Sequence, residues 1–158
     1  MDRSAASEGE FPRSFEVAFA RLQIVIVEAC GARREWPEKA AAGIAAALRF
    51  AATEPESVRR LTSEALAHGV EGIARHERLI AYLSQGLVTG RGERPGGERL
   101  PEITEDALAS GIVMLVSQRV DRGEARDLLA TTPDVIQFML TPYLGAAEAR
   151  RVGSQHGP

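Results

Sequence analysis

Histidine and glutamate side chains are grouped near the middle of the chain, and these are residue types that bind zinc. His68 and His76 have Glu71 and Glu77 close by, and imidazole nitrogens and carboxylate oxygens are common zinc ligands. Two ligands on one helix face need an i, i+4 spacing, which these histidines lack, and Gly69 is expected to end a helix between them. We therefore predict no metal site, and we expect both histidines to be surface or pocket-lining residues.

The chain carries no pattern typical of nucleophilic catalysis or nucleotide binding. Its one cysteine, Cys30, has no evident histidine partner, and no Gly-x-Ser-x-Gly elbow is present. The stretch GRGERPGG, residues 90–97, follows no strand and lacks the Lys-Ser/Thr pair of a P-loop. We therefore expect a protein that is not an enzyme and uses no cofactor, with residues 90–97 as a flexible linker.

Length, charge and composition describe a globular chain of one domain. The 158 residues are 44% hydrophobic and 26% charged, and a formal net charge of −3 argues against nucleic-acid binding by this chain alone. A single cysteine excludes an internal disulfide and favours a reducing compartment. The N-terminal residues lack the apolar region of a signal peptide, and no apolar run approaches the roughly 20 residues that span a bilayer. We expect a cytoplasmic protein without membrane contact.

The spacing of apolar residues predicts an all-α fold, a helical bundle of about six or seven helices. The first helix is expected to start at Phe15, with Ser14 as its N-cap, and to be closed by Gly31. The β-branched run at residues 24–27 would also suit a buried strand. The helical spacing of Phe15, Phe19 and later apolar residues, and the lack of a second strand to pair with, favour the helix.

Glycine, proline and charged residues separate the remaining predicted helices. These helices fall at residues 35–55, 56–69, 71–88, 103–123 and 132–145, with a loop at 89–102 and a short helical piece at 124–130. The chain is therefore expected to divide into a flexible N-terminal segment (1–13), a folded domain (14–147) and a flexible tail (148–158).

Two segments, GIVMLV (residues 111–116) and DVIQFML (134–140), are apolar on nearly every side. A helix of that kind must be covered all round, and in a small chain part of the cover is expected from another molecule. Two such helices from each of two subunits would form an intermolecular four-helix bundle and a homodimer. The alternative is that one of them is the central helix of a monomeric bundle. The candidate interface residues are Ala107, Gly111, Ile112, Leu115, Val135, Phe138 and Met139.

From about Glu10 to Arg150, the chain resembles the C-terminal ligand-binding and dimerisation domain of TetR-family (tetracycline-repressor-like) transcriptional regulators. The resemblance is carried by FEVAFARL, by REWPEKAAAGIAAALRFAATEPESVRRLTSEAL, by ERLIAYL before a Gly/Pro-rich loop, and by the region from LPEITEDALASGIVMLV to PYLG. It implies that the last two long helices form the dimer interface. The earlier helices would enclose an apolar pocket for a small hydrophobic or aromatic effector, whose binding moves an N-terminal helix-turn-helix pair on DNA.

The predicted pocket residues are apolar or amphipathic side chains on the inner faces of the helices, with ordinary core packing as the alternative role for each.

The family places its three-helix DNA-binding module before the segment equivalent to Phe15, where this sequence has only residues 1–14. DNA binding is therefore expected only through a helix-turn-helix outside this chain. The alternative function is a stand-alone helical interaction protein that heterodimerises with an intact regulator; a third is a small-molecule carrier or enzyme on the same bundle. The candidate pocket residues are Phe19, Gln23, Phe50, His76, Tyr82 and Met114.

Overall fold

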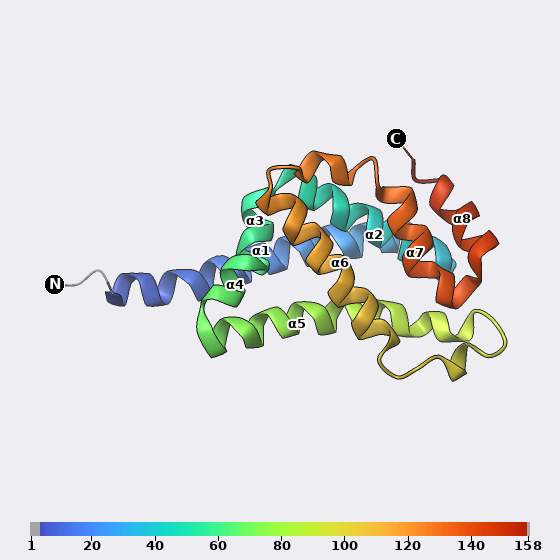
Figure 1. The fold of residues 1–158 in the computed structure, drawn as a ribbon, viewed down its shortest axis with the longest axis horizontal. Helices are drawn as coiled ribbons and strands as arrows, with labels where there is room; N and C mark the ends of the chain where they lie inside the picture. The colour runs from blue at the N-terminus through green and yellow to red at the C-terminus, as the bar shows by residue number, and fades with distance from the viewer. Residues whose placement is uncertain (1–3, 158) are drawn as a thin grey trace.

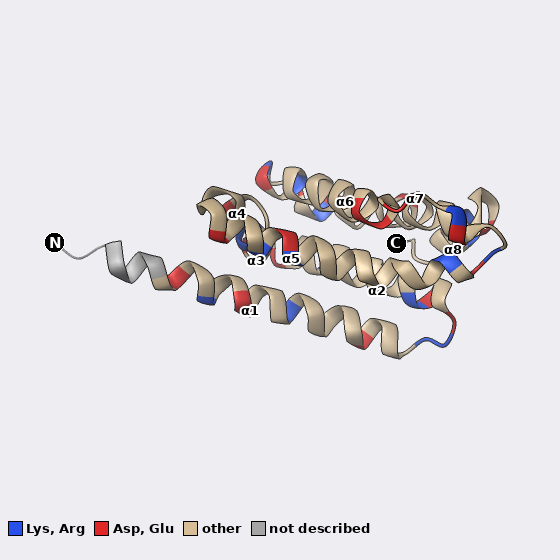
Figure 2. Cartoon of the chain, turned by 90° about the horizontal axis from the view of Figure 1, so that it is seen from below, with Lys and Arg blue, Asp and Glu red and all other residues tan. Residues whose placement is uncertain are grey.

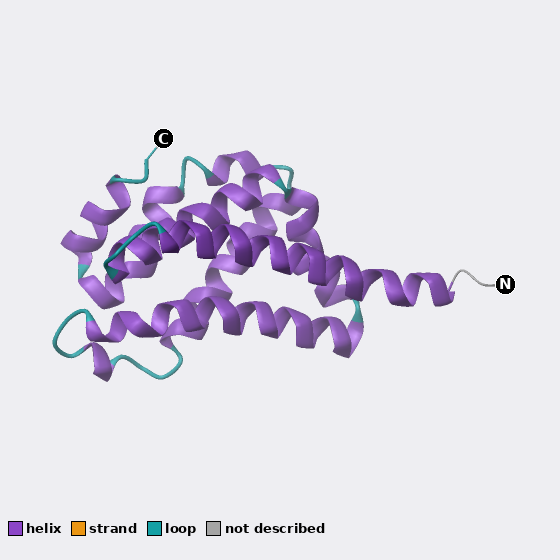
Figure 3. Cartoon of the chain, turned by 180° about the vertical axis from the view of Figure 1, so that it is seen from behind, coloured by secondary structure: helices purple, strands orange, loops and turns teal. Residues whose placement is uncertain are grey.

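A computed structural model describes the backbone of residues 4–157 and the side chains of residues 9–157. Helices joined by loops and short turns make up this part of the chain, and it contains no strand (Figures 1 and 3). The predicted all-α fold is therefore confirmed. Short 3-10 turns lie in the loop before α6 (η1, Thr89–Gly92; η2, Gly97–Arg99) and before α7 (η3, Ala125–Leu128). The helices are α1 (Ser4–Gly31), α2 (Trp36–Thr53), α3 (Pro55–Leu61), α4 (Ser63–Ala67), α5 (Gly69–Val88), α6 (Thr104–Asp121), α7 (Thr132–Leu144) and α8 (Ala146–Ser154).

Helix α1 runs along one face of the molecule, and α6 and α7 run along the opposite face (Figure 2). Helix α2 contacts α1, α6, α7 and α8. Its buried residues are mostly alanines, which let neighbouring helix backbones come close. Pro37 stands in the first turn of α2, where its missing N–H group costs no hydrogen bond. None of the described helices combines the length and low polarity needed to cross a bilayer.

Helix α1 begins earlier than the sequence pattern predicts. Ser14 is not its N-cap, because it lies within the helix and its hydroxyl donates to the Phe11 carbonyl at 2.9 Å. The ring of Phe11 stacks on His68 with centroids 3.7 Å apart. This tertiary contact stabilises the helical conformation on the N-terminal side of Pro12. Of the predicted flexible segment, residues 4–13 therefore belong to α1, while residues 1–3 lie outside the described part. The strand alternative at residues 24–27 is wrong, since these residues also lie in α1.

The single helix predicted at residues 56–69 is divided into α3 and α4. The break is at Thr62, which has φ −122° and ψ −97°, while its hydroxyl donates to the Val58 carbonyl at 2.8 Å. Val58, Leu61 and Ala65 are buried. Leu66 is exposed, because the break changes the phase of the residues that follow.

Residues 146–154 form helix α8 at the C-terminal end of the domain. Ala149 and Val152 of α8 are buried against Ile136 and Leu140 of α7. Gly153 lies so close to α7 that a Cβ atom there would stand 2.6 Å from the Pro133 carbonyl oxygen. The predicted start of a flexible tail after residue 147 therefore falls inside a packed helix, because this short segment has an apolar face that α7 covers. Residue 158 lies outside the described part.

A buried ionic cluster joins the loop after α5 to α6 and α7. Arg91 donates two parallel hydrogen bonds to Glu105, Nε to Oε1 at 2.8 Å and Nη2 to Oε2 at 2.7 Å. It also donates to the carbonyls of Leu100 and Pro101, each at 2.8 Å. The hydroxyl of buried Tyr143 donates to Glu105 Oε1 at 3.1 Å. The segment predicted as a flexible linker is therefore held in place, because Arg91 near the start of the loop is hydrogen-bonded to Leu100 and Pro101 at its end.

The cluster changes the acidity of its members in opposite directions. The hydrogen bonds from Arg91 hold the pKa of Glu105 below its ordinary value of 4.5, despite the burial of this carboxyl group. Burial, with the neighbouring negative charge of Glu105, raises the pKa of Tyr143. Glu105 is therefore ionised and Tyr143 is a neutral hydrogen-bond donor at neutral pH.

We expect Glu105→Gln to lower the free energy of unfolding by about 2 kcal/mol. The substitution keeps the shape of the side chain but leaves Arg91 without its counter-charge, and the loss stays below that of a fully buried pair because the Arg91 side chain is 22% exposed. Urea denaturation followed by circular dichroism measures the difference. Glu98→Gln, an exposed change in the same loop, is the matched control, and equal stability of the two variants would contradict the stabilising role of the cluster.

The advantage of wild type over Glu105→Gln should also depend on pH. The pKa of Glu105 is lower in the folded chain than in the unfolded chain. The contribution of its charge to the free energy of unfolding is therefore fully present above about pH 4.5, and it is lost as the pH falls through the pKa of the folded chain. Denaturation curves of the two proteins should therefore differ at neutral pH and converge in increasingly acidic buffer. A difference that stays constant on acidification would rule out this ionic contribution.

Candidate ligand cavity and the exposed face of α6 and α7

A large apolar cavity lies among α1, α2, α3, α5 and α6. Its volume of about 740 Å³ is within the range of roughly 300–1,000 Å³ that is usual for small-molecule sites. The lining is mainly aliphatic and aromatic, with few polar groups. Representative wall residues are Leu22 and Ile26 of α1, Ile44 and Phe50 of α2, Leu61 of α3, Leu79, Tyr82 and Leu83 of α5, and Ile112, Val113 and Val116 of α6.

The cavity exists because α2 presents small residues to it. Ala40, Gly43, Ala47 and Ala51 all line the space. A Cβ atom on Gly43 would stand 3.0 Å from the Cys30 sulfur, so the helices are already close at this point. Elsewhere the short side chains do not reach across to α5 and α6, and the volume between them stays unfilled.

Two of the six predicted pocket residues, Phe50 and Tyr82, line the cavity. Phe19 does not line it but packs edge-on against Tyr82, with ring centroids 5.6 Å apart. Gln23 also lies outside the lining, although its neighbour Leu22 is part of it. One step along a helix turns a side chain by about 100°, which separates such neighbours.

The other two predicted pocket residues also lie away from the cavity. Met114 is 61% exposed on the outer side of α6, whereas Val113 beside it lines the cavity. His76 is half-buried on α5 but does not line the cavity; burial lowers its pKa, which keeps it neutral at pH 7. The predictions for Met114 and His76 as pocket residues are therefore not supported by the geometry.

The polar groups of the inner wall are neutral. The thiol of Cys30 donates to the Lys39 carbonyl at 3.3 Å, and burial raises its pKa. Burial also raises the pKa of Tyr82, whose phenol therefore stays protonated. The hydroxyl of Thr62 is occupied by its bond to Val58. The cavity interior consequently suits an uncharged, apolar group.

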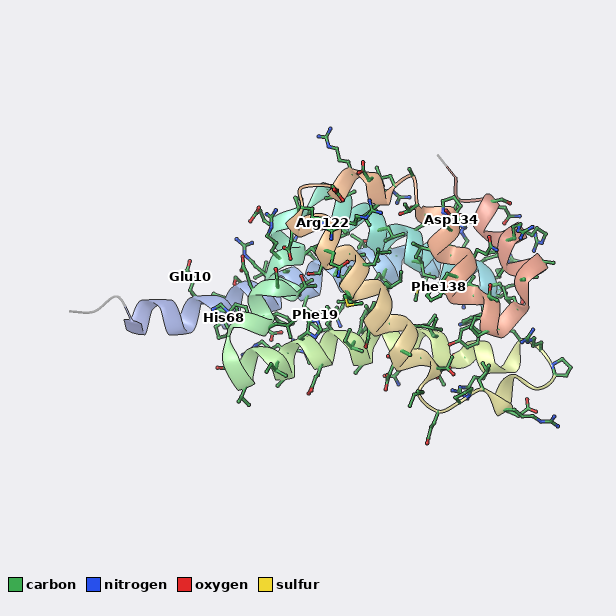
Figure 4. All side chains as sticks on the ribbon, in the orientation of Figure 1. Glu10, Phe19, His68, Arg122, Asp134 and Phe138 are labelled. Carbon is green, nitrogen blue, oxygen red and sulfur yellow. The ribbon has the colours of Figure 1, made fainter. Side chains whose placement is uncertain are left out.

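Among the described residues, no three His, Cys, Asp or Glu side chains are grouped closely enough to hold a metal ion, and this includes the two histidines noted in the sequence. His68, which is labelled in Figure 4, stacks on Phe11, and its Nδ1 is 2.6 Å from the Glu64 carbonyl oxygen. Its role is to pack α1 against the α4–α5 junction.

Three large apolar side chains on α6, on α7 and at the residue before α6 are exposed. Ile103, directly before α6, is 71% exposed, Met114 61% and Phe138 of α7 59%. A shallow groove beside Phe138 is lined by residues of both helices, including Leu108 and Asp134. Figure 4 labels Phe138 and Asp134 on α7. This face, defined by Ile103, Ala107, Met114 and Phe138, is called the α6–α7 face below.

The predicted interface residues fall into outward and inward groups. Ala107 and Phe138 are exposed, and Gly111 and Leu115 are half-buried. The chain itself covers most of the apolar surface that made both segments notable in the sequence, which is how a small domain accommodates them. Ile112 and Met139 line the cavity, and Val135 is buried in the core, so these three are not available to a partner.

Sequence reasoning missed the two basic residues of the cavity lining, Arg33 and Lys39. Arg33 lies in the α1–α2 connection and Lys39 in the first turns of α2, and neither belongs to an apolar stripe. Only the packing of α1, α2 and α5 places them beside an apolar space.

Comparison with known proteins adds no identification, because no family model, curated protein or solved structure matches this chain.

We expect a neutral fluorescent apolar probe, N-phenyl-1-naphthylamine, to bind the wild-type cavity. Ala47→Phe should weaken this binding by roughly tenfold or more, about 1.4 kcal/mol, because the ring fills space that the probe needs. Fluorescence titration measures both affinities. Ala81→Phe adds the same ring at an exposed α5 position outside the cavity and should bind like wild type. Equal affinities of the two variants would mean that the probe binds elsewhere.

Proposed function

We propose that the chain is the effector-binding and dimerisation domain of a TetR-type transcriptional regulator. The observation that carries the proposal is the cavity of about 740 Å³, whose apolar wall is formed mainly by α1, α2, α3, α5 and α6. The sequence resemblance leads to the same division of roles, with a small hydrophobic or aromatic effector held by the earlier helices. The proposal includes a cytoplasmic location, and DNA binding only through a helix-turn-helix outside this chain.

Contacts between α5 and α1 offer a route from the effector to α1. Tyr82 lines the cavity and packs against Phe19 of α1. The Arg78 guanidinium lies 4.9 Å from the Phe19 ring centroid and donates to Glu16 of α1 at 2.6 Å. A ligand that displaces Tyr82 therefore changes the energy of these contacts, which is the differential interaction that a ligand-driven shift of α1 requires.

The dimer part of the proposal assigns the α6–α7 face to a second copy of the chain. Exposed Met114 and Phe138 are large apolar side chains, a type enriched at protein interfaces. Exposed Ala107 and half-buried Gly111 lie one turn apart on α6 and let another helix come close. Two helices from each subunit then form a four-helix bundle related by two-fold symmetry.

The same face also suits the alternative function, in which the chain heterodimerises with an intact regulator and removes one of its two DNA-reading modules. A complex with one reader has half of the DNA contacts and binds its operator weakly. The two functions differ in what the isolated chain does: a homodimerising domain associates alone, and an interaction protein of this kind associates only with its partner.

We expect the wild-type chain to sediment as a dimer at micromolar concentration and Met114→Asp to sediment as a monomer. The aspartate introduces two like charges into the symmetric apolar contact without disturbing the core, since Met114 is already exposed. Sedimentation velocity measures the change.

Val70→Asp is the matched control, because Val70 is 86% exposed at the start of α5 and outside the α6–α7 face. It should remain a dimer. A wild-type chain that is monomeric at this concentration contradicts the homodimer and favours the alternative function.

A further inference from the structure

We propose that the cavity takes an amphipathic anion, a ligand with an apolar body and a carboxylate or similar acidic head, and that Arg33 and Lys39 hold the head. The proposal rests on the proposed function for the presence of a ligand in the cavity, and it adds the chemical class and orientation of that ligand. The sign of the charges in the cavity lining is the basis for it.

The charged residues of the lining are both cations. Arg33 and Lys39 line the cavity, and no aspartate or glutamate does. Neither side chain takes part in any of the ion pairs found among the described residues. An anionic head would therefore meet positive charge that no described carboxylate already neutralises.

Both cations lie at the mouth of the cavity. Arg33 and Lys39 are exposed, as are the lining residues Gly31, Gln85 and Gly86, which belong to the adjoining ends of α1 and α5. The indole Nε1 of Trp36, at the start of α2, donates to the Gly86 carbonyl at 3.3 Å and ties α2 to α5 at this end.

Three carboxylates are close in sequence to this mouth, and none of them lines the cavity. Glu28, Glu35 and Glu38 are all exposed and lie outside the cavity lining. The charge of Glu38 acts on Arg151 of α8. Arg33 and Lys39 thus belong to the cavity lining, and the nearby carboxylates do not.

The interior determines how the ligand is oriented. An ionised head placed deep in the cavity would lose its hydration among apolar side chains such as Leu61, Leu79 and Val113, with the Thr62 hydroxyl already bonded to a carbonyl. At the mouth the head keeps water and gains Arg33 and Lys39. The apolar body therefore points inward and the acidic head outward.

Displacement of N-phenyl-1-naphthylamine by decanoate, decanol and decyltrimethylammonium tests the proposal, because the three compounds share a ten-carbon chain and differ in head charge. Decanoate should bind more tightly than decanol by roughly three- to thirtyfold, the scale of two partly exposed ion pairs. Decyltrimethylammonium should bind most weakly. The preference for decanoate should shrink as salt is added.

The double substitution Arg33→Gln with Lys39→Gln should abolish the preference for decanoate and leave the affinity for decanol unchanged. Both positions are exposed, so the fold is expected to persist, and circular dichroism with decanol binding verifies it. Arg34→Gln removes one positive charge from an exposed neighbour that does not line the cavity, and it should keep the preference.

Equal affinity of wild type for decanoate and decanol, or a preference that persists in the double variant, overturns the anionic-ligand proposal while the cavity remains a ligand site. If the wild-type chain binds neither the neutral probe nor decanol, the cavity is not a ligand site, and the result contradicts the proposed effector-binding function.

Discussion

The small side chains of α2 are the constraint on which the rest of the structure depends. On one side of α2, Ala41 and Ala45 are buried with Ile136 and Leu140 of α7, and the short methyl groups bring the two helices together. On another side, Gly43 and Ala47 face the cavity, where the same shortness leaves space open. Close packing in one direction and a void in the other follow from one alanine-rich helix, because interiors are filled by side-chain volume.

Helix α6 connects the cavity to the exposed α6–α7 face. Ile112 and Val113 line the cavity, and Met114, the next residue, points away from it. A wall residue and an exposed residue therefore share consecutive positions on one rigid helix. Any displacement of α6 by a bound ligand would be carried to the α6–α7 face without intermediate contacts, which gives the proposed effector site and the proposed dimer surface a common element.

Charged groups act in two different settings in this molecule. Half-buried Arg91 and buried Glu105 are joined by two hydrogen bonds, and Tyr143 donates a third bond to Glu105. Their charges neutralise each other and hold the loop before α6 in place. Arg33 and Lys39 lie at the surface next to apolar space, and no described carboxylate pairs with them. The first pair serves the structure, and the second remains free to act on a ligand.

Local sequence pattern was sufficient for the all-α fold and for the general course of α2, α5, α6 and α7. The repeat of apolar residues every three to four positions, with Pro37 at a helix start, is a property of neighbouring residues and survives in any helical tertiary structure. Of the six residues that the sequence marked as pocket candidates, Phe50 and Tyr82 line the cavity and the other four do not.

The tertiary structure alone decided which apolar residues face the cavity, the core or the exterior. Ile112, Val113 and Met114 are equally apolar in the sequence, and only the position of neighbouring helices assigns them to different surroundings. The N-terminal extension of α1 is stabilised by a ring contact with His68, far along the chain. Arg33 and Lys39 gained their place at the cavity mouth in the same way. Such contacts join residues that are distant in the sequence, and the local spacing of apolar residues cannot predict them.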